Sequence, residues 1–133
     1  MKKRYRSREK LKSRTRIDEL FQKGKSLSVP PIRLSFQFEP ASGAAGLQAG
    51  VTASKKNFKR AVDRNRLKRV LRESYRLQKE SLVQLTLKHN LNGYLFFIYT
   101  SKTMMPFAAV QEAMAKCLQK LESNIGAKHE KPS

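Results

Sequence analysis

Alternating apolar and polar residues predict three β-strands in this chain. Residues 32–38 alternate strictly, with Ile, Leu and two Phe facing one way and Arg, Ser and Gln facing the other, which is typical of a strand with one buried face. Residues 47–53 alternate less clearly, because Ala and Gly fill part of the pattern. Residues 94–100, YLFFIYT, are rich in strand-forming side chains and follow an Asn-Gly pair at 92–93 that predicts a turn.

Apolar residues at helical spacing predict three helices. The first begins near Thr15, which can cap it, and stops at Gly24. The second begins near Ala61 and continues, with or without a break, through residues 77–87. Pro106 is suited to the first position of a closing helix. The apolar stripe of that helix consists of Val110, Met114, Cys117, Leu118 and Leu121.

The resulting order, α-β-β-α-β-α, predicts an α/β (α+β) two-layer sandwich in which helices pack on one small mixed sheet. Residues 15–125 are expected to form a single domain, between a flexible basic arm at 1–14 and a polar tail at 126–133. The chain has no run of 18 or more apolar residues, and no apolar segment follows its basic N-terminus. We therefore expect neither a membrane span nor a secretory signal.

Positive charge adds an expectation about the partner. The chain holds 29 Lys and Arg residues against 10 Asp and Glu, for a formal net charge of +19. Residues 1–16 hold nine Lys and Arg and one acid, and residues 55–76 hold ten and two, so each segment contributes a net charge of +8. Neutralisation of phosphates by such cations drives nucleic-acid binding, and an anionic partner also relieves their mutual repulsion. The sequence therefore predicts a nucleic-acid partner and two contact surfaces.

The second basic segment predicts a helix with a cationic side. Residues 55–60 read as a basic loop, and in residues 61–76 the apolar positions fall opposite the cationic ones. Arg64, Lys68 and Arg72 recur every four residues, which is about 6 Å along a helix axis. Guanidinium groups bind phosphates through paired hydrogen bonds. Like charges at this spacing destabilise an isolated helix, so the pattern favours an anionic partner over an ordinary solvated surface.

The same segment resembles a known family. Residues 64–66 read Arg-Asn-Arg, and with the Lys-Arg pair at 68–69 and the Arg-Glu pair at 72–73 they resemble the RNR signature of the bacterial ribonuclease P protein family. A Ser-Lys-Lys triplet at 54–56 also resembles that family, and the resemblance extends over roughly residues 11–121.

Several expectations follow from this resemblance. It implies the family's α/β sandwich, with two parallel strands joined by a left-handed crossover, an exception to a strong rule. It implies a protein subunit of ribonuclease P that assists endonucleolytic 5′-end maturation of precursor tRNA, one monomer per RNA subunit. The RNA subunit would hold the catalytic Mg²⁺, and the protein would supply neither catalytic residues nor metal ligands. The residues implied to bind the RNA subunit are Lys55, Lys56, Lys59, Arg60, Arg64, Asn65, Arg66, Lys68, Arg69, Arg72 and Arg76.

The resemblance also implies a cleft between the N-terminal helix and the sheet, which receives the 5′ leader of precursor tRNA. The strand pattern agrees in part, because it places Arg33, Ser35 and Gln37 on the polar face. Ile17 and Ser35 stand where the family often has aromatic residues, so we expect weaker base stacking there. For Phe21, base stacking and packing on the sheet are equally compatible with the sequence. The leader-binding residues are thus expected to be Ile17, Phe21, Arg33, Ser35 and Gln37.

Two other functions stay open on composition alone. A structural RNA-binding protein, such as a ribosomal protein, would be equally small and basic, and a DNA-binding or membrane-surface module would also fit a cationic helix. The single cysteine, Cys117, lies on an apolar stripe and predicts a core thiol in a reducing, cytoplasmic setting. His89 and His129 have no partner motif, so we expect surface residues and no metal site.

Overall fold

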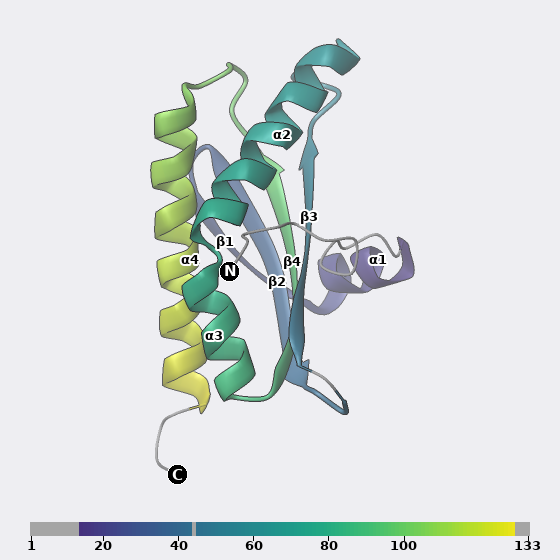
Figure 1. Cartoon of the computed structure of the whole chain (residues 1–133). Coiled ribbons are helices and arrows are strands. Elements are labelled where there is room, and N and C mark those ends of the chain that lie inside the picture. The colour runs from purple at the N-terminus through teal and green to yellow at the C-terminus, as the bar shows by residue number, and fades with distance from the viewer. Residues whose placement is uncertain (1–13, 44, 130–133) are drawn as a thin grey trace.

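A computed structural model describes residues 14–43 and 45–129 of the chain, with side chains at 15–43 and 45–125. Within these ranges, four strands form one mixed sheet in the order β1-β2-β4-β3, three helices cover one face and a fourth helix lies on the other (Figure 1). The elements in chain order are α1 (Arg14–Lys23), β1 (Lys25–Val29), β2 (Ile32–Pro40), β3 (Gly46–Ala53), α2 (Ala61–Gln78), α3 (Glu80–Lys88), β4 (Leu91–Tyr99) and α4 (Phe107–His129).

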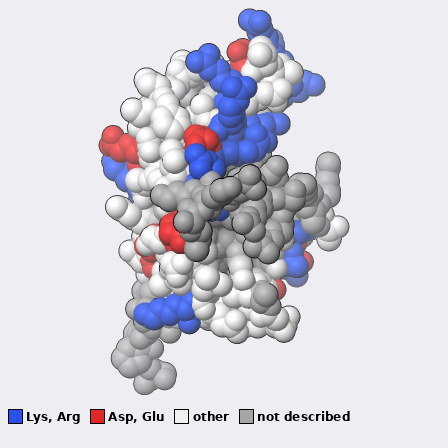
Figure 2. All heavy atoms as spheres, viewed as in Figure 1, with Lys and Arg blue, Asp and Glu red and all other residues white. Residues whose placement is uncertain are grey.

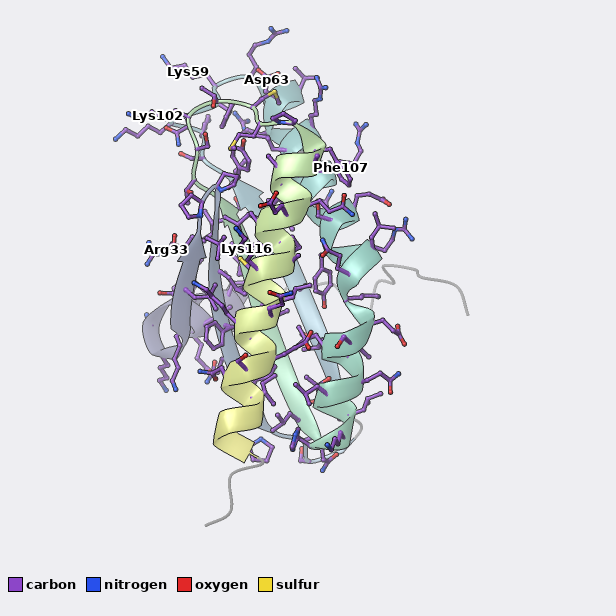
Figure 3. All side chains as sticks on the ribbon, turned by 90° about the vertical axis from the view of Figure 1, so that its left-hand side faces the viewer. Arg33, Lys59, Asp63, Lys102, Phe107 and Lys116 are labelled. Carbon is purple, nitrogen blue, oxygen red and sulfur yellow. The ribbon has the colours of Figure 1, made fainter. Side chains whose placement is uncertain are left out.

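The central strand β4 joins the two halves of the sheet. It pairs antiparallel with β2, where Ile32 lies opposite Tyr99, and parallel with β3, where Gly46 lies opposite Asn92. The chain passes from β3 to β4 through α2 and α3, which cover one face. Viewed from that face with both strands pointing up, β4 lies to the left of β3 (Figure 3), so the crossover is left-handed. This is the hand that the family resemblance implied.

The main core lies between the sheet and α2, α3 and α4. Alternate residues of the strands point into it, including Leu34 of β2, Ala49 of β3 and Phe97 of β4. Leu67 and Leu71 of α2 meet them from the helix side. The stripe predicted for the last helix is fully buried, which confirms that α4 packs with Val110, Met114, Cys117, Leu118 and Leu121 inward.

The first helix, α1, lies against the opposite face of the sheet. Its Leu20 is buried beside Tyr94, and Ile17 and Phe96 pack around this pair in a second, small cluster. Tyr94 and Phe96 alternate along β4 with the core-facing Leu95, so they point away from α2, α3 and α4. The predicted α/β sandwich is therefore confirmed. In addition, α1 packs on one end of the sheet face that points away from α2, α3 and α4.

The sheet contains a strand that the sequence pattern did not predict. β1 forms an antiparallel hairpin with β2, in which Leu27 lies opposite Leu34. The turn between the two strands contains a cis peptide bond between Pro30 and Pro31. Leu27 and Val29 do alternate with polar residues, but two apolar positions in five residues give only a weak signal of period two.

The prediction of a turn at residues 92–93 was wrong, because both residues lie inside β4. The chain turns directly before the strand, at Asn90, whose φ of 53° lies in the left-handed region. A glycine is required at position 93 by close packing and not by a turn. A Cβ atom at this position would lie 2.5 Å from Cδ2 of Leu47 and 2.5 Å from Cε1 of Phe38.

Helix boundaries agree with the prediction closely, with one correction. α2 begins at Ala61 as expected, and the break that was left open occurs at Lys79, which separates α2 from α3. α4 begins directly after Pro106. Thr15 was expected to cap the first helix, but it lies within α1, which begins at Arg14.

The close approach at Gly93 gives a test of the fold. We expect Gly93→Ala to lower the free energy of unfolding by about 1–3 kcal/mol, because the added methyl group must displace two packed side chains. Urea denaturation followed by circular dichroism measures this change. Gly46→Ala is the matched control, since a Cβ there meets no atom within 4 Å, and it should change stability by less than about 0.5 kcal/mol. Equal losses in the two variants would contradict crowding as the cause.

Candidate nucleic-acid interface

The helix α2 separates an apolar side from a cationic side. Leu67, Leu71 and Tyr75 recur at intervals of four residues and are buried in the core. On the opposite side, Figure 2 shows Lys and Arg side chains gathered along α2. We call the following four residues the cationic face of α2: Arg66, Lys68, Arg69 and Arg72.

The cationic face is free of ion pairs to the part of the chain that the structure describes. Asn65 is exposed beside these cations, as predicted. Unpaired like charges held this close raise the free energy of the fold. The four side chains are therefore available to an anionic partner.

Arg64 is placed differently from the other predicted cations. Its Nη1 donates hydrogen bonds to the backbone carbonyls of Phe58 and Lys59, at 2.8 Å each. Its guanidinium therefore ties the loop at residues 54–60 to the first turn of α2, and its predicted contact with RNA stays a prediction. No spacing pattern along the chain indicates this contact, which depends on the path of the loop.

Arg76 is also engaged within the chain. Its guanidinium forms an ion pair with Glu73, and Nε lies 3.1 Å from Oε1 of that carboxylate. The hydrogen bond from Arg76 holds the pKa of Glu73 below its usual range, and the same bond raises the pKa of Arg76. Arg76 was predicted to bind RNA, but part of its charge is already compensated.

The loop before α2 presents further cations from an anchored backbone. The side chain of Phe58 is buried, and its ring meets that of Tyr99 edge-on with centroids 5.8 Å apart. The hydroxyl of Ser54 accepts a hydrogen bond from the backbone N–H of Lys56 at 3.1 Å. The sequence pattern did not single out Phe58, although a lone apolar residue inside a basic loop indicates that its side chain fixes the loop to the core. The exposed cations of this loop are Lys55, Lys56, Lys59 and Arg60.

A second predicted surface lies on the face of the sheet away from α2, α3 and α4. Arg33 is exposed there (Figure 3) and lies opposite Ile98 of β4. Ser35 lies opposite Phe96 but is only 5% exposed, so its hydroxyl offers little surface to a ligand. We call this surface, which consists of Arg33, Ser35, Phe96 and Ile98, the open sheet face.

Gln37 lies nearer to the end of α1 than the other polar residues of β2. It is opposite Tyr94, and with Lys23 and Lys25 it lines a hollow of about 210 Å³. Gln37 therefore shares the face of β2 that carries Arg33 and Ser35, at the end nearer to α1.

The α1 residues predicted to contact the leader divide into one exposed and one packed side chain. Phe21 is 50% exposed and meets Phe96 edge-on, with ring centroids 5.4 Å apart. It therefore packs on the sheet and still presents part of its ring to solvent. Ile17 packs against Leu20 and Tyr94 and serves the small cluster under α1.

Arg16 fixes the position of α1 and was missed by the sequence analysis. Its guanidinium carbon lies 4.3 Å above the ring of Tyr94, and its Nη1 lies 3.6 Å from Oε1 of Glu39 on β2 and 3.4 Å from Oε1 of Glu19. Burial under α1 raises the pKa of the Tyr94 hydroxyl. These contacts hold α1 against one end of the sheet.

Other titratable residues show no arrangement for chemistry in the described part of the chain. No group of three His, Cys, Asp or Glu side chains there could hold a metal ion. Burial raises the pKa of the Cys117 thiol to about 11, so this thiol is protonated at neutral pH and belongs to the core. His89 is half-buried at the end of α3, and the side chain of His129 lies outside the described residues. None of the described helices combines the length and apolarity needed to cross a bilayer.

Comparison with known proteins gives the family. Residues 5–122 match the sequence model of the family described as Ribonuclease P. The ribonuclease P protein component of Porphyromonas gingivalis is 34% identical over 117 residues, which cover 88% of this chain and 85% of that protein. The corresponding protein of Borrelia turicatae is 30% identical over 100 residues, which cover 75% and 80%.

Solved structures share the fold at lower identity. The RNase P protein from Thermotoga maritima superposes with a TM-score of 0.64 at 23% identity, over 84% of this chain and 96% of that chain. The Staphylococcus aureus RNase P protein superposes with a TM-score of 0.65 at 20% identity, over 85% and 94%. With the sequence match over residues 5–122, these similarities show that the chain belongs to the ribonuclease P protein family.

Proposed function

We propose that this chain is the protein subunit of a bacterial ribonuclease P, in which it binds the RNA subunit and the 5′ leader of precursor tRNA and assists cleavage at the tRNA 5′ end. The observation that carries this proposal is the cationic face of α2. It presents four cations without ion pairs to the described residues, within the segment that gave the family resemblance. A cytoplasmic location stays a prediction.

The proposed contact with the RNA subunit combines the cationic face with the loop at residues 54–60. Arg66, Arg69 and Arg72 can each bind phosphate oxygens through two parallel hydrogen bonds, whereas lysines act as point charges. Arg64 supports this surface indirectly, since it holds the carbonyls of the loop. The loop then presents its cations from a defined backbone, which lowers the entropy cost of binding.

The proposed contact with the leader uses Phe21 and the open sheet face. A half-exposed Phe ring can stack on a base of a single strand, and Arg33 can neutralise a nearby phosphate. Ile17 packs in the cluster under α1, and Ser35 is nearly buried. Neither residue therefore offers a surface on which a base could stack. Stacking contacts accept many sequences, since every base has a flat face.

The two proposed surfaces lie on opposite sides of the sheet. α2 covers one face, and the open sheet face points the other way. One protein monomer can therefore hold the RNA subunit on one side and the leader on the other, which positions the substrate against its catalyst.

In this proposal the RNA subunit supplies the chemistry. Mg²⁺ ions bound to that RNA would activate the attacking water and stabilise the leaving oxygen. The protein would contribute binding and orientation, and its cations would reduce the repulsion between two polyanions.

Reconstitution tests the proposal as a whole. Added to a bacterial ribonuclease P RNA transcript at low Mg²⁺, the protein should restore cleavage of precursor tRNA at the mature 5′ end, because its cations replace part of the screening that Mg²⁺ provides. Gel analysis of a labelled precursor measures the rate. Cleavage no faster than with the RNA alone would overturn the proposal.

The cationic face predicts a change in salt dependence. Arg72→Ala should weaken binding to the RNA subunit and reduce the slope of log affinity against log salt by about 0.7–1, because one phosphate contact is lost. Filter binding at several KCl concentrations measures the slope. Lys120→Ala removes the same charge from an exposed position on α4 and should leave the slope nearly unchanged. The same slope in wild type and Arg72→Ala would remove Arg72 from the interface.

The leader contact predicts a selective loss. Phe21→Ala should weaken binding of precursor tRNA by about tenfold, because stacking on a base contributes ~1–3 kcal/mol, and should leave the binding of mature tRNA unchanged. Binding is measured with the assembled protein–RNA complex. Leu87→Ala is the matched control, since Leu87 is 49% exposed on α3, and we expect no effect on either RNA. Equal losses for precursor and mature tRNA would contradict a leader contact at Phe21.

A further inference from the structure

The segment between β4 and α4 exposes apolar side chains in an otherwise polar environment. All seven residues from 102 to 108 are exposed. Met104, Met105 and Phe107 are 38%, 37% and 39% exposed. Large exposed apolar side chains cost solvation free energy, and several of them within one short segment can mark a binding surface. We call these three residues the apolar ledge.

Hydrogen bonds hold the ledge in one conformation. The Tyr99 hydroxyl donates to the carbonyl of Thr103 at 2.6 Å and accepts from the backbone N–H of Met105 at 2.9 Å. The backbone N–H of Thr100 donates to the carbonyl of Pro31 at 2.8 Å, and the hydroxyl of Ser101 accepts from the backbone N–H of Thr103 at 3.2 Å. The apolar side chains are therefore exposed on a restrained backbone.

The surroundings of the ledge are strongly cationic. The ring of Tyr99 contacts Phe58, so the loop at residues 54–60 and the segment at 100–106 meet at the same end of the sheet. These two segments together contain five Lys and Arg residues and no acid. Lys59, Asp63, Lys102 and Phe107 lie at this end of the molecule, with Phe107 on the other side of α4 from Lys59 and Lys102 (Figure 3). The neighbourhood thus complements an anionic partner and repels a second copy of this chain.

Of the three ledge residues, Phe107 lies on the side of α4 next to α2 (Figure 3). Figure 2 shows an uncharged surface at the N-terminal end of α4, beside the Lys and Arg side chains along α2. An RNA whose phosphates lie on α2 would therefore meet apolar side chains at this edge. Unpaired RNA bases bind such side chains by stacking, aromatic ones above all.

We propose that Phe107 of the apolar ledge stacks on an unpaired base of the RNA held on α2. This inference rests on the proposed function, because the RNA in question is the RNA subunit. Tyr99 acts as a positioning residue, since its hydroxyl holds the backbone on both sides of Met104.

Ring substitution at Phe107 tests the proposal. Phe107→Leu keeps an apolar side chain but removes the aromatic face, and it should weaken binding to a bacterial ribonuclease P RNA transcript about tenfold. Phe107→Tyr keeps the ring and should bind within about twofold of wild type. The salt slope should be the same in all three proteins, because stacking releases no counterions. Base-directed chemical probing should show one unpaired base protected by wild type and Phe107→Tyr but not by Phe107→Leu.

The other outcomes separate the alternatives. Leu87→Ala, with similar exposure on α3, should bind RNA as wild type does. Wild-type affinity in Phe107→Leu, or equal losses in the Leu and Tyr variants, would overturn the stacking role. A wild-type dimer in sedimentation that Phe107→Leu converts to a monomer would assign the ledge to self-association instead. If the wild-type protein restores cleavage while Phe107→Leu binds normally, the ledge proposal alone fails. If the wild-type protein restores no cleavage, the proposed function fails.

Discussion

Burial of one side of α2 against the sheet is the interaction on which the molecule depends. Leu67, Leu71 and Tyr75 are at most 2% exposed, and Tyr75 packs its ring against Phe97 with centroids 5.4 Å apart. Burying such side chains contributes about 1.5–3 kcal/mol each, whereas a like-charge pair one turn apart costs only about 0.2–0.5 kcal/mol. The apolar contacts therefore outweigh the repulsion. Since a helix is rigid, they also set the direction of each cation on the outer side.

The basic residues around α2 differ in what they do, although a charge count treats them alike. Arg72 and its neighbours on the cationic face have no ion pair to the described residues. Arg64 organises the preceding loop through two carbonyls, and Arg76 is held by Glu73. Arg64 and Arg76 thus stabilise the local structure of this segment, and the residues of the cationic face project from it.

Most of the fold was predictable because its long elements have clear periodicity. Residues 32–38 of β2 alternate strictly, and α4 repeats its apolar stripe over several turns. β1 was missed because five residues carry too little pattern, and the Asn-Gly pair at 92–93 was misread because packing against Phe38, and not a turn, requires Gly93.

The candidate site was predictable to the extent that it depends on helix geometry. Amphipathic spacing alone indicated that Lys68, Arg69 and Arg72 face outward. The bonds of Arg64 to loop carbonyls, and the placement of Arg16 over Tyr94, depend on tertiary approach. Such contacts join residues with no fixed spacing along the chain, so no local pattern reveals them.

The position of β4 has a consequence for how the chain folds during synthesis. β2 and β3 are neighbours in sequence, yet they lie one strand apart and β4 fills the gap between them. On the ribosome, the hairpin of β1 and β2 can form early, but the sheet stays incomplete until Tyr99 has emerged. Pairing of such distant segments is slow, because the intervening chain must be closed first. The nascent protein therefore exposes apolar strand faces until late in translation, when chaperones or an RNA partner can shield them.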